Sequence, residues 1–200
     1  MSTWLVGGPL RTREGTLTFF TGIRNTTTAN YCLVRKLVYL SLGSNVGDRE
    51  ANLRKAISRL AAIGSVQKIS SFYETEPVEF VAQPWFLNCA VALETEKMPK
   101  QLLSAILQIE QEMGRRRESK KGPRTIDIDI LLFGSSVIDI KDLTIPHPAM
   151  HQRRFVLEPL VEIAPEQRHP IFKRTLRELR DALPAGQSVR RKGFPQSAGQ

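Results

Sequence analysis

The stretch that decides the fold reads GPRTIDIDILLF and covers residues 122–133. Three isoleucines and Leu132 alternate with polar residues, which predicts a β-strand with one buried face. Asp127 and Asp129 are two positions apart, so they share the other face, about 6–7 Å apart along the backbone. Two carboxylates about 5 Å apart repel by about 3 kcal/mol at an effective dielectric near 20. This pattern favours a divalent cation with oxygen ligands, such as Mg²⁺, over the alternative of a solvated polar face.

A run of basic residues lies immediately before this strand. Arg115, Arg117 and Arg124 are predicted to contact phosphate, because a guanidinium fork can bridge two phosphate oxygens. Arg116 and Lys120 are predicted to be solvated only. Metal-binding carboxylates beside guanidinium groups indicate polyphosphate chemistry. There is no P-loop and no Gly-x-Gly-x-x-Gly, so a Walker or Rossmann nucleotide site is not expected.

In the segments that precede the aspartate strand, and in that strand itself, hydrophobic periodicity predicts strands and helices in the order β-α-β-β-α-β. This is the ferredoxin-like α+β pattern, with an antiparallel sheet and two helices over one face. C-terminal additions should follow the core. The core elements are expected at 37–42 (strand), 48–64 (helix), 66–73 and 86–94 (strands), 99–114 (helix) and 126–133 (strand), and the additions at 137–140 (strand), 150–157 (helix) and 175–183 (helix).

The 200-residue chain predicts one domain, residues 37–184, flanked by two basic segments. Residues 1–36 contribute +4 of the net charge of +9 and are expected to be a disordered extension. That composition fits either a transit peptide or a dispensable leader. Residues 185–200 contribute +3 and are expected to be a flexible basic tail, which leaves +2 for the domain. A nearly neutral domain with one basic patch fits a small anionic ligand better than a nucleic acid.

The rest of the composition favours a cytoplasmic protein, with organelle targeting by the extension as the alternative. Cys32 and Cys89 are the only cysteines, so a disulfide framework is not indicated. No apolar run is long enough for a membrane span, and no secretory signal is recognisable. We expect a monomer that binds neither membranes nor nucleic acids.

Two further groups of residues are candidates for ligand binding. Phe86 and Asn88 share a strand face, where they could stack on and hydrogen-bond a flat heterocycle. A core phenylalanine beside a turn-capping asparagine is the equally open alternative. His147 lies between two prolines and precedes Arg153. A loop histidine is more often a surface residue, and phosphate contact is the alternative that its cationic neighbours support.

Several of these motifs together resemble the 6-hydroxymethyl-7,8-dihydropterin pyrophosphokinase family of folate biosynthesis. The resemblance runs from Leu37 to about Pro170, and the Gly-Pro-Arg-Thr-x-Asp-x-Asp signature is its most specific part. The motifs are LGSN (42–45), SFYET (71–75), QPWFLN (83–88), 110–115, 122–133, IPHP (145–148) and RRF (153–155).

The resemblance implies transfer of pyrophosphate from ATP to the hydroxymethyl group of the dihydropterin, with release of AMP. It implies two Mg²⁺ ions held by Asp127 and Asp129. Lys121 departs from the family, where many members have tryptophan. The remaining implied roles are catalysis for Arg115 and Arg124, ATP binding for Glu110, Arg117, Lys121, His147 and Arg153, and pterin binding for Thr75, Val78, Phe86, Asn88 and Phe155.

Two rival functions remain compatible with a ferredoxin-like sheet. A nucleotidyl transferase of the palm type would also use paired aspartates but would release pyrophosphate instead of AMP. An RNA-binding module would need exposed aromatic side chains on a basic sheet face. Tyr39 is the chief aromatic residue that the first strand could contribute. Asp127 and Asp129 would make the sheet acidic where RNA binding needs a neutral or basic face, so RNA binding is the weaker alternative.

Overall fold

The computed structural model describes residues 35–77, 84–114 and 124–193. All elements described below belong to the unit Leu33–Gln200. The predicted extension, residues 1–36, therefore lies almost entirely outside the described residues. Within the described ranges, every helix is too short or too polar to span a membrane.

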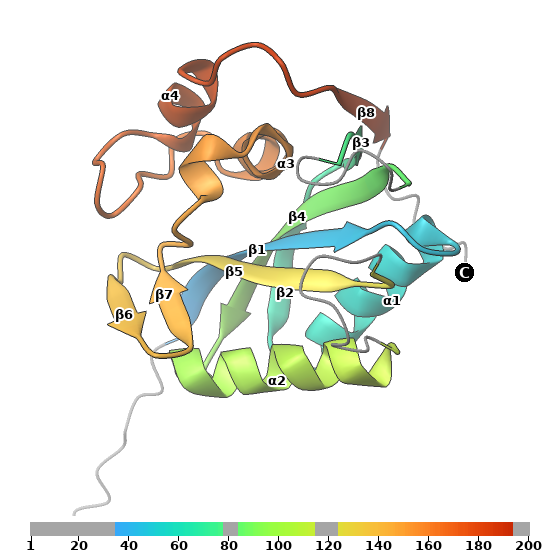
Figure 1. The fold of residues 1–200 in the computed structure, drawn as a ribbon. Helices are drawn as coiled ribbons and strands as arrows, with labels where there is room; N and C mark the ends of the chain where they lie inside the picture. Colours follow the sequence, from blue (N-terminus) through green and yellow to red (C-terminus); the bar gives the residue numbers. More distant parts are fainter. Residues whose placement is uncertain (1–34, 78–83, 115–123, 194–200) are drawn as a thin grey trace, which may run out of the picture. The chain divides into compact units, whose positions relative to one another are not determined.

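The core is the predicted α+β arrangement, an antiparallel sheet flanked by helices (Figure 1). The six-stranded sheet has the order β5-β1-β4-β3-β8, and β2 also pairs with β4. The core elements are β1 (Lys36–Ser44), α1 (Arg49–Leu60), β2 (Ser65–Ile69), β3 (Phe72–Thr75), β4 (Phe86–Thr95), α2 (Pro99–Glu112) and β5 (Asp127–Phe133). The predicted βαββαβ order is confirmed, with its second strand in two pieces.

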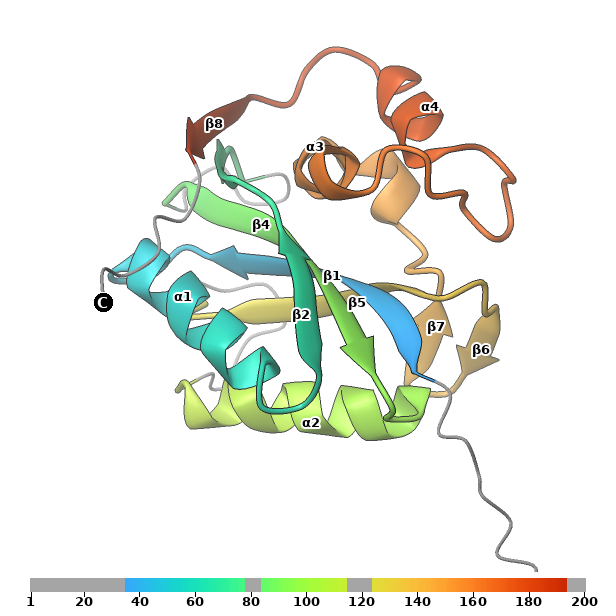
Figure 2. The same ribbon diagram turned by 180° about the vertical axis from the view of Figure 1, so that it is seen from behind.

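The break between β2 and β3 corrects the single strand predicted for residues 66–73. Ser70 and Ser71 are fully buried at the break. The Ser70 backbone N–H donates to the Ala90 carbonyl at 2.9 Å, and the Ser70 hydroxyl accepts from the Ala90 N–H at 2.9 Å. These bonds tie the break to β4, so β2 pairs with the second half of β4 and β3 with its start (Figure 2).

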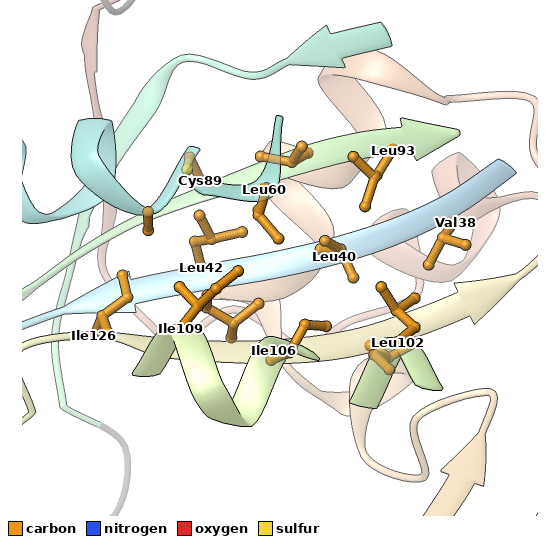
Figure 3. Packing of buried hydrophobic residues seen from close by; sticks show 14 of the residues in the cluster. Val38, Leu40, Leu42, Leu60, Cys89, Leu93, Leu102, Ile106, Ile109 and Ile126 are labelled. Atoms are coloured by element: carbon orange, nitrogen blue, oxygen red, sulfur yellow. The ribbon is translucent and has the colours of Figure 1, made fainter. Parts of the chain in front are cut away.

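The first of two hydrophobic cores lies between the sheet and helices α1 and α2. Alternate residues of β1 and β4 point into it, including Leu40, Leu42 and Leu93, as the period-two pattern predicted. They pack against Ile106 and Ile109 of α2 (Figure 3). Helix α1 begins at the predicted cap, where the Asp48 carboxylate accepts from the Ala51 N–H at 3.0 Å.

The opposite face of the sheet is also covered, which the sequence did not predict. Helices α3 (Arg154–Ile163) and α4 (Leu176–Asp181) pack there around Leu157 and Leu160. A register shift where β5 pairs with Tyr39 and Leu40 leaves Leu131 without a partner in the ladder. Leu132 therefore points to this second core instead of continuing the alternation of the isoleucines.

The C-terminal additions differ in detail from the predicted ones. They comprise β6 (Ile138–Ile140), β7 (Leu143–Ile145), the 3₁₀ turn η1 (Met150–Gln152), α3, α4 and β8 (Val189–Gly193). Strand β8 pairs with β3, so part of the segment predicted as a flexible tail from residue 185 belongs to the sheet. A short, basic strand on a sheet edge has little hydrophobic periodicity, which is why the pattern missed it.

Candidate active site

The candidate site lies where β1 ends and where β4 and β5 begin. In the antiparallel register, Gly43 of β1 is paired with Asn88 on one side and with Asp127 on the other. Neighbouring strands are about 4.8 Å apart, so the Cα atoms of Asn88 and Asp127 are separated by about 10 Å. The register therefore brings a predicted pterin residue and a predicted metal ligand to the two sides of one glycine.

Gly43 is required at this position because the Asn88 side chain occupies the space above it. A Cβ atom on Gly43 would lie 2.6 Å from Asn88 Oδ1 and 3.8 Å from Phe86 Cδ1. These distances place Phe86 and Asn88 on the same face of β4, as predicted. Asn88 is buried, and its Nδ2 donates to Thr75 Oγ1 at 2.7 Å. Thr75 and Asn88 therefore form one fixed polar pair.

Asn45 holds the start of the aspartate strand against the end of β1. Its backbone N–H donates to the Arg124 carbonyl at 3.1 Å, and its Oδ1 accepts from the Arg124 N–H at 2.7 Å. The Arg124 guanidinium in turn forms an ion pair with the Asp127 carboxylate. Asn45 was part of a quoted motif, but no role was predicted for it. In the structure, Asn45 holds the backbone of Arg124 in position through these two hydrogen bonds.

Glu110 lies almost fully buried near the end of α2, at 2% exposure. Its Oε1 accepts a hydrogen bond from the backbone N–H of Ile128 at 2.8 Å. Ile128 is the residue between the two aspartates, so Glu110 fixes the strand that carries them. The contact with ATP predicted for Glu110 stays a prediction.

Asp127 and Asp129 lie on the same, partly buried face of β5, while Ile128 points into the core. The pKa of Asp129 is raised to about 7, chiefly by burial and then by the charges of Asp127 and Glu110, against the opposing effect of Arg153 and Arg124. The carboxyl groups of Asp127, Asp129 and Glu110 therefore lie so close together that ionising all of them at once is costly. Across residues 35–77, 84–114 and 124–193, no three His, Cys, Asp or Glu side chains gather as a ready set of metal ligands.

His147 and Arg153 approach the same face from the segment after β7. The backbone N–H of His147 donates to the Leu131 carbonyl of β5 at 2.9 Å. Its Nδ1 accepts from the Ala149 N–H at 3.2 Å, which leaves the hydrogen of the neutral ring on Nε2. Burial lowers the pKa of His147, and the nearby charge of Arg153 lowers it further. A neutral imidazole donor and a guanidinium therefore lie beside the aspartates.

Phe155 follows from the first turn of α3. The Arg153 guanidinium lies 5.7 Å from the centre of the Phe155 ring. This contact links a residue predicted to bind ATP with one predicted to bind the pterin. Of the remaining predicted site residues, Arg115, Arg117, Lys121 and Val78 lie outside the described residues.

Sequence reasoning missed a second set of contacts around Trp85. The Arg49 guanidinium donates to the Trp85 carbonyl at 2.7 Å and to Glu74 Oε1 at 2.7 Å. The Arg190 guanidinium lies 5.0 Å from the centre of the Trp85 ring. Trp85 directly precedes Phe86, so these contacts fix the start of β4. No pattern in the sequence joins residues so far apart along the chain.

Paired carboxylates beside guanidinium groups at the ends of neighbouring strands are the arrangement expected of a phosphoryl-transfer enzyme. Comparison with known families identifies which one. The sequence pattern of the 7,8-dihydro-6-hydroxymethylpterin-pyrophosphokinase (HPPK) family matches residues 39–165. The chain belongs to this family, and it is an ATP-dependent pyrophosphokinase, as the resemblance implied.

Individual relatives agree with this assignment. The 2-amino-4-hydroxy-6-hydroxymethyldihydropteridine pyrophosphokinase of Bacillus subtilis is 50% identical over 133 residues, which cover 65% of this chain and 79% of the relative. The protein of the same name from Aquifex aeolicus is 45% identical, with 72% and 89% covered. The folic acid synthesis protein fol1 of Schizosaccharomyces pombe is 43% identical, but the match covers only 21% of its length.

Solved structures support the fold. The Plasmodium falciparum HPPK-DHPS chain crystallised with pteroate superposes with a TM-score of 0.62 at 17% identity. The match covers 74% of this chain and 44% of that one. The chain thus spans less than half of that longer protein.

Proposed function

We propose that this chain transfers pyrophosphate from ATP to 6-hydroxymethyl-7,8-dihydropterin beside the end of β1 and the starts of β4 and β5. The observation that carries the proposal is the pairing of Gly43 with both Asn88 and Asp127. A heterocycle held at Asn88 would therefore lie two strand spacings, about 10 Å, from Asp127, with its substituent free to extend across Gly43 toward the aspartates. Donor phosphates and acceptor can then be held together, which is the main source of rate enhancement in such a transfer.

The residues present fit magnesium. Asp127 and Asp129 offer oxygen ligands, and Mg²⁺ is commonly held by one or two carboxylates together with substrate phosphates. The raised pKa of Asp129 supports this, because a cation would relieve the repulsion from Asp127. Two ions, as implied by the family resemblance, would neutralise the phosphate charge and lower the barrier to transfer. Asp127 and Asp129 would hold them.

The remaining side chains would bind and orient the two substrates. Arg124 and Arg153 supply positive charge for the phosphates, and His147 donates from Nε2. Glu110, Arg117 and Lys121 are proposed at the ATP site, and Arg115 as a catalytic residue with Arg124, on the family resemblance. For Arg115 and Arg117 the phosphate contact predicted from the sequence adds support.

The acceptor would lie against the aromatic side chains Phe86 and Phe155. The Asn88 amide and groups around Thr75 and Val78 would read the edge of its ring. Because Thr75 already holds Asn88, the amide is oriented before the pterin binds. We further propose that the protein works as a cytoplasmic monomer and binds neither nucleic acid nor membrane.

Product analysis tests the proposal. ATP, Mg²⁺ and the dihydropterin are incubated with the full chain and with a shortened chain that begins at Leu37. The proposal predicts AMP and the dihydropterin pyrophosphate, with equal rates if residues 1–36 are dispensable. Release of pyrophosphate would instead identify a nucleotidyl transferase. Asp129→Ala should abolish turnover while leaving pterin affinity nearly intact, and normal turnover in that variant would refute the metal assignment.

A further inference from the structure

The C-terminal strand β8 lies outside the part of the chain that matches the family, which ends at residue 165. It nevertheless pairs with β3 along its length, with Val189 opposite Thr75 and Arg190 opposite Glu74. In Figures 1 and 2, β8 runs beside β3 on the side of the sheet where α3 lies. This addition therefore borders the strand that ends at Thr75.

Gln187, just before β8, reaches the first turn of α3. Its Oε1 accepts a hydrogen bond from the backbone N–H of Phe155 at 3.2 Å. The N-cap residue of α3, Arg153, makes no side-chain capping bond of its own. The first N–H groups of a helix need an outside acceptor, so Gln187 supplies part of the missing cap. It also fixes the backbone at Phe155.

The same segment is also joined to the chain that follows Thr75, on the other side of the proposed pterin site. The Ser188 carbonyl accepts from the Glu76 N–H at 3.3 Å, and Gln187 Nε2 donates to the Glu76 carbonyl at 3.4 Å. Glu76 directly follows Thr75. Gln187 therefore connects the backbone next to Thr75 with the backbone of Phe155.

Arg190 makes the third connection. Its guanidinium lies over the Trp85 ring at 5.0 Å, and the Trp85 carbonyl is already held by Arg49 at 2.7 Å. Stacking by a guanidinium fixes the ring plane as well as its position. Because Trp85 adjoins Phe86, the contact limits the freedom of the aromatic residue at the start of β4.

A polar network holds β8 against β3 and α3, and it thereby fixes the segment that carries Gln187 and Arg190. The Glu162 carboxylate of α3 accepts from Arg191 Nη2 at 2.8 Å, from Tyr73 OH at 2.8 Å and from the Ser71 hydroxyl at 2.8 Å. Arg191 Nε also donates to Ser71 Oγ at 3.0 Å. The network joins α3, β3 and β8, and Glu162 has a lowered pKa despite partial burial because these donors stabilise its charge.

We propose that the segment Gln187–Arg191 positions the side chains of the proposed pterin site, with Gln187 fixing Phe155 and Arg190 fixing Trp85 beside Phe86. The proposal rests on the proposed pterin site, and it adds residues that the family pattern does not cover. Gln187 and Arg190 are positioning residues, since they act through the side chains and backbone they hold. Their loss should weaken pterin binding much more than ATP binding, which they reach only through the contact of Phe155 with Arg153.

Steady-state kinetics on the full chain tests this. Each of the two contacts should correspond to a factor of about three to ten in affinity. The double variant Gln187→Ala/Arg190→Ala should therefore raise KM for the pterin about tenfold or more. The KM for ATP should rise by a clearly smaller factor, because Arg153 is affected only indirectly, through its contact with Phe155. The value of kcat at saturating pterin should stay within about twofold, because Asp127 and Asp129 are untouched.

Conservative and matched variants separate positioning from general damage. Arg190→Lys keeps a cation over Trp85 but loses the planar group that fixes the ring plane, so it should recover only part of the pterin KM. Gln187→Glu keeps an acceptor for the Phe155 N–H but loses the bond to the Glu76 carbonyl, so its recovery should also be partial. Lys192→Ala removes an exposed charge from the same strand and should behave as the wild type.

Two results would overturn the proposal. One is an unchanged pterin KM in the double variant, and the other is an equal rise in the KM values of both substrates. If the wild type itself released no AMP, the proposed function would fail and the positioning role would fail with it. Wild-type AMP release with an unchanged variant KM would refute the positioning role alone.

Discussion

Replacement of Asp129 by asparagine should change how the metal-free protein responds to pH. The pKa of Asp129 is raised from 3.8 to about 7 in the folded protein. Between these values the folded chain keeps a proton that the unfolded chain has released, so the free energy of unfolding falls as pH rises. The shift is about three units, and each unit corresponds to about 1.4 kcal/mol. The wild type should therefore lose up to about 4 kcal/mol between pH 4 and pH 8 from this group.

The asparagine variant lacks this titration. In the presence of a chelator, Asp129→Asn should have a stability close to that of the wild type near pH 4. Near pH 8 it should exceed the wild type by up to about 4 kcal/mol, or about 10 °C in melting temperature for a domain of this size. Added Mg²⁺ should restore the wild type at pH 8, because a cation relieves the repulsion, and should not affect the variant.

The assay is thermal or urea unfolding at several pH values with and without chelator. The quantity of interest is the difference in the free energy of unfolding between wild type and variant, in which the titrating groups that do not interact with Asp129 cancel. Asp142→Asn is the matched control, because it removes a carboxylate from an exposed turn. A difference between wild type and Asp129→Asn that stays constant from pH 4 to pH 8 would refute the reasoning.

Two further substitutions test the geometry of the site. Gly43→Ala places a methyl group 2.6 Å from Asn88 Oδ1, so the amide must move away from Thr75, and KM for the pterin should rise about tenfold. An unchanged KM would show that Asn88 does not read the pterin. Asn45→Ala removes the acceptor of the Arg124 N–H, which should lower the free energy of unfolding by about 1–2 kcal/mol and lower kcat more than it changes the pterin KM. Calorimetry and the AMP assay measure the two effects, and a wild-type kcat would argue against placement of Arg124 by Asn45.

The elements with strong local patterns could be predicted from the sequence. The alternation predicted the correct faces in β4 and in the first half of β5, up to Ile130. The cap at Asp48 predicted the start of α1. The ferredoxin-like order followed from these elements. The common face of Asp127 and Asp129 required only the two-residue period of a strand.

The parts that failed depend on contacts between distant segments. The break at Ser70 and Ser71 is held by β4, and the register shift beside Leu131 arises in the pairing with β1. Strand β8 is a basic edge strand, whose place is set by pairing with β3 and by Glu162 rather than by its own pattern. The contacts of Gln187 with Phe155 and Glu76 could not be predicted for the same reason, since both residues are more than thirty positions away along the chain.

The most direct measurement is the distance between the metal site and the bound pterin. Mn²⁺ in place of Mg²⁺, with a non-hydrolysable ATP analogue, should strongly enhance the nuclear relaxation of pterin protons, since Asn88 and Asp127 flank Gly43. Asp129→Asn should reduce that enhancement while the pterin remains bound. Pterin that binds the wild type together with Mn²⁺ but shows no enhancement would contradict a single site shared by the aspartates and the acceptor.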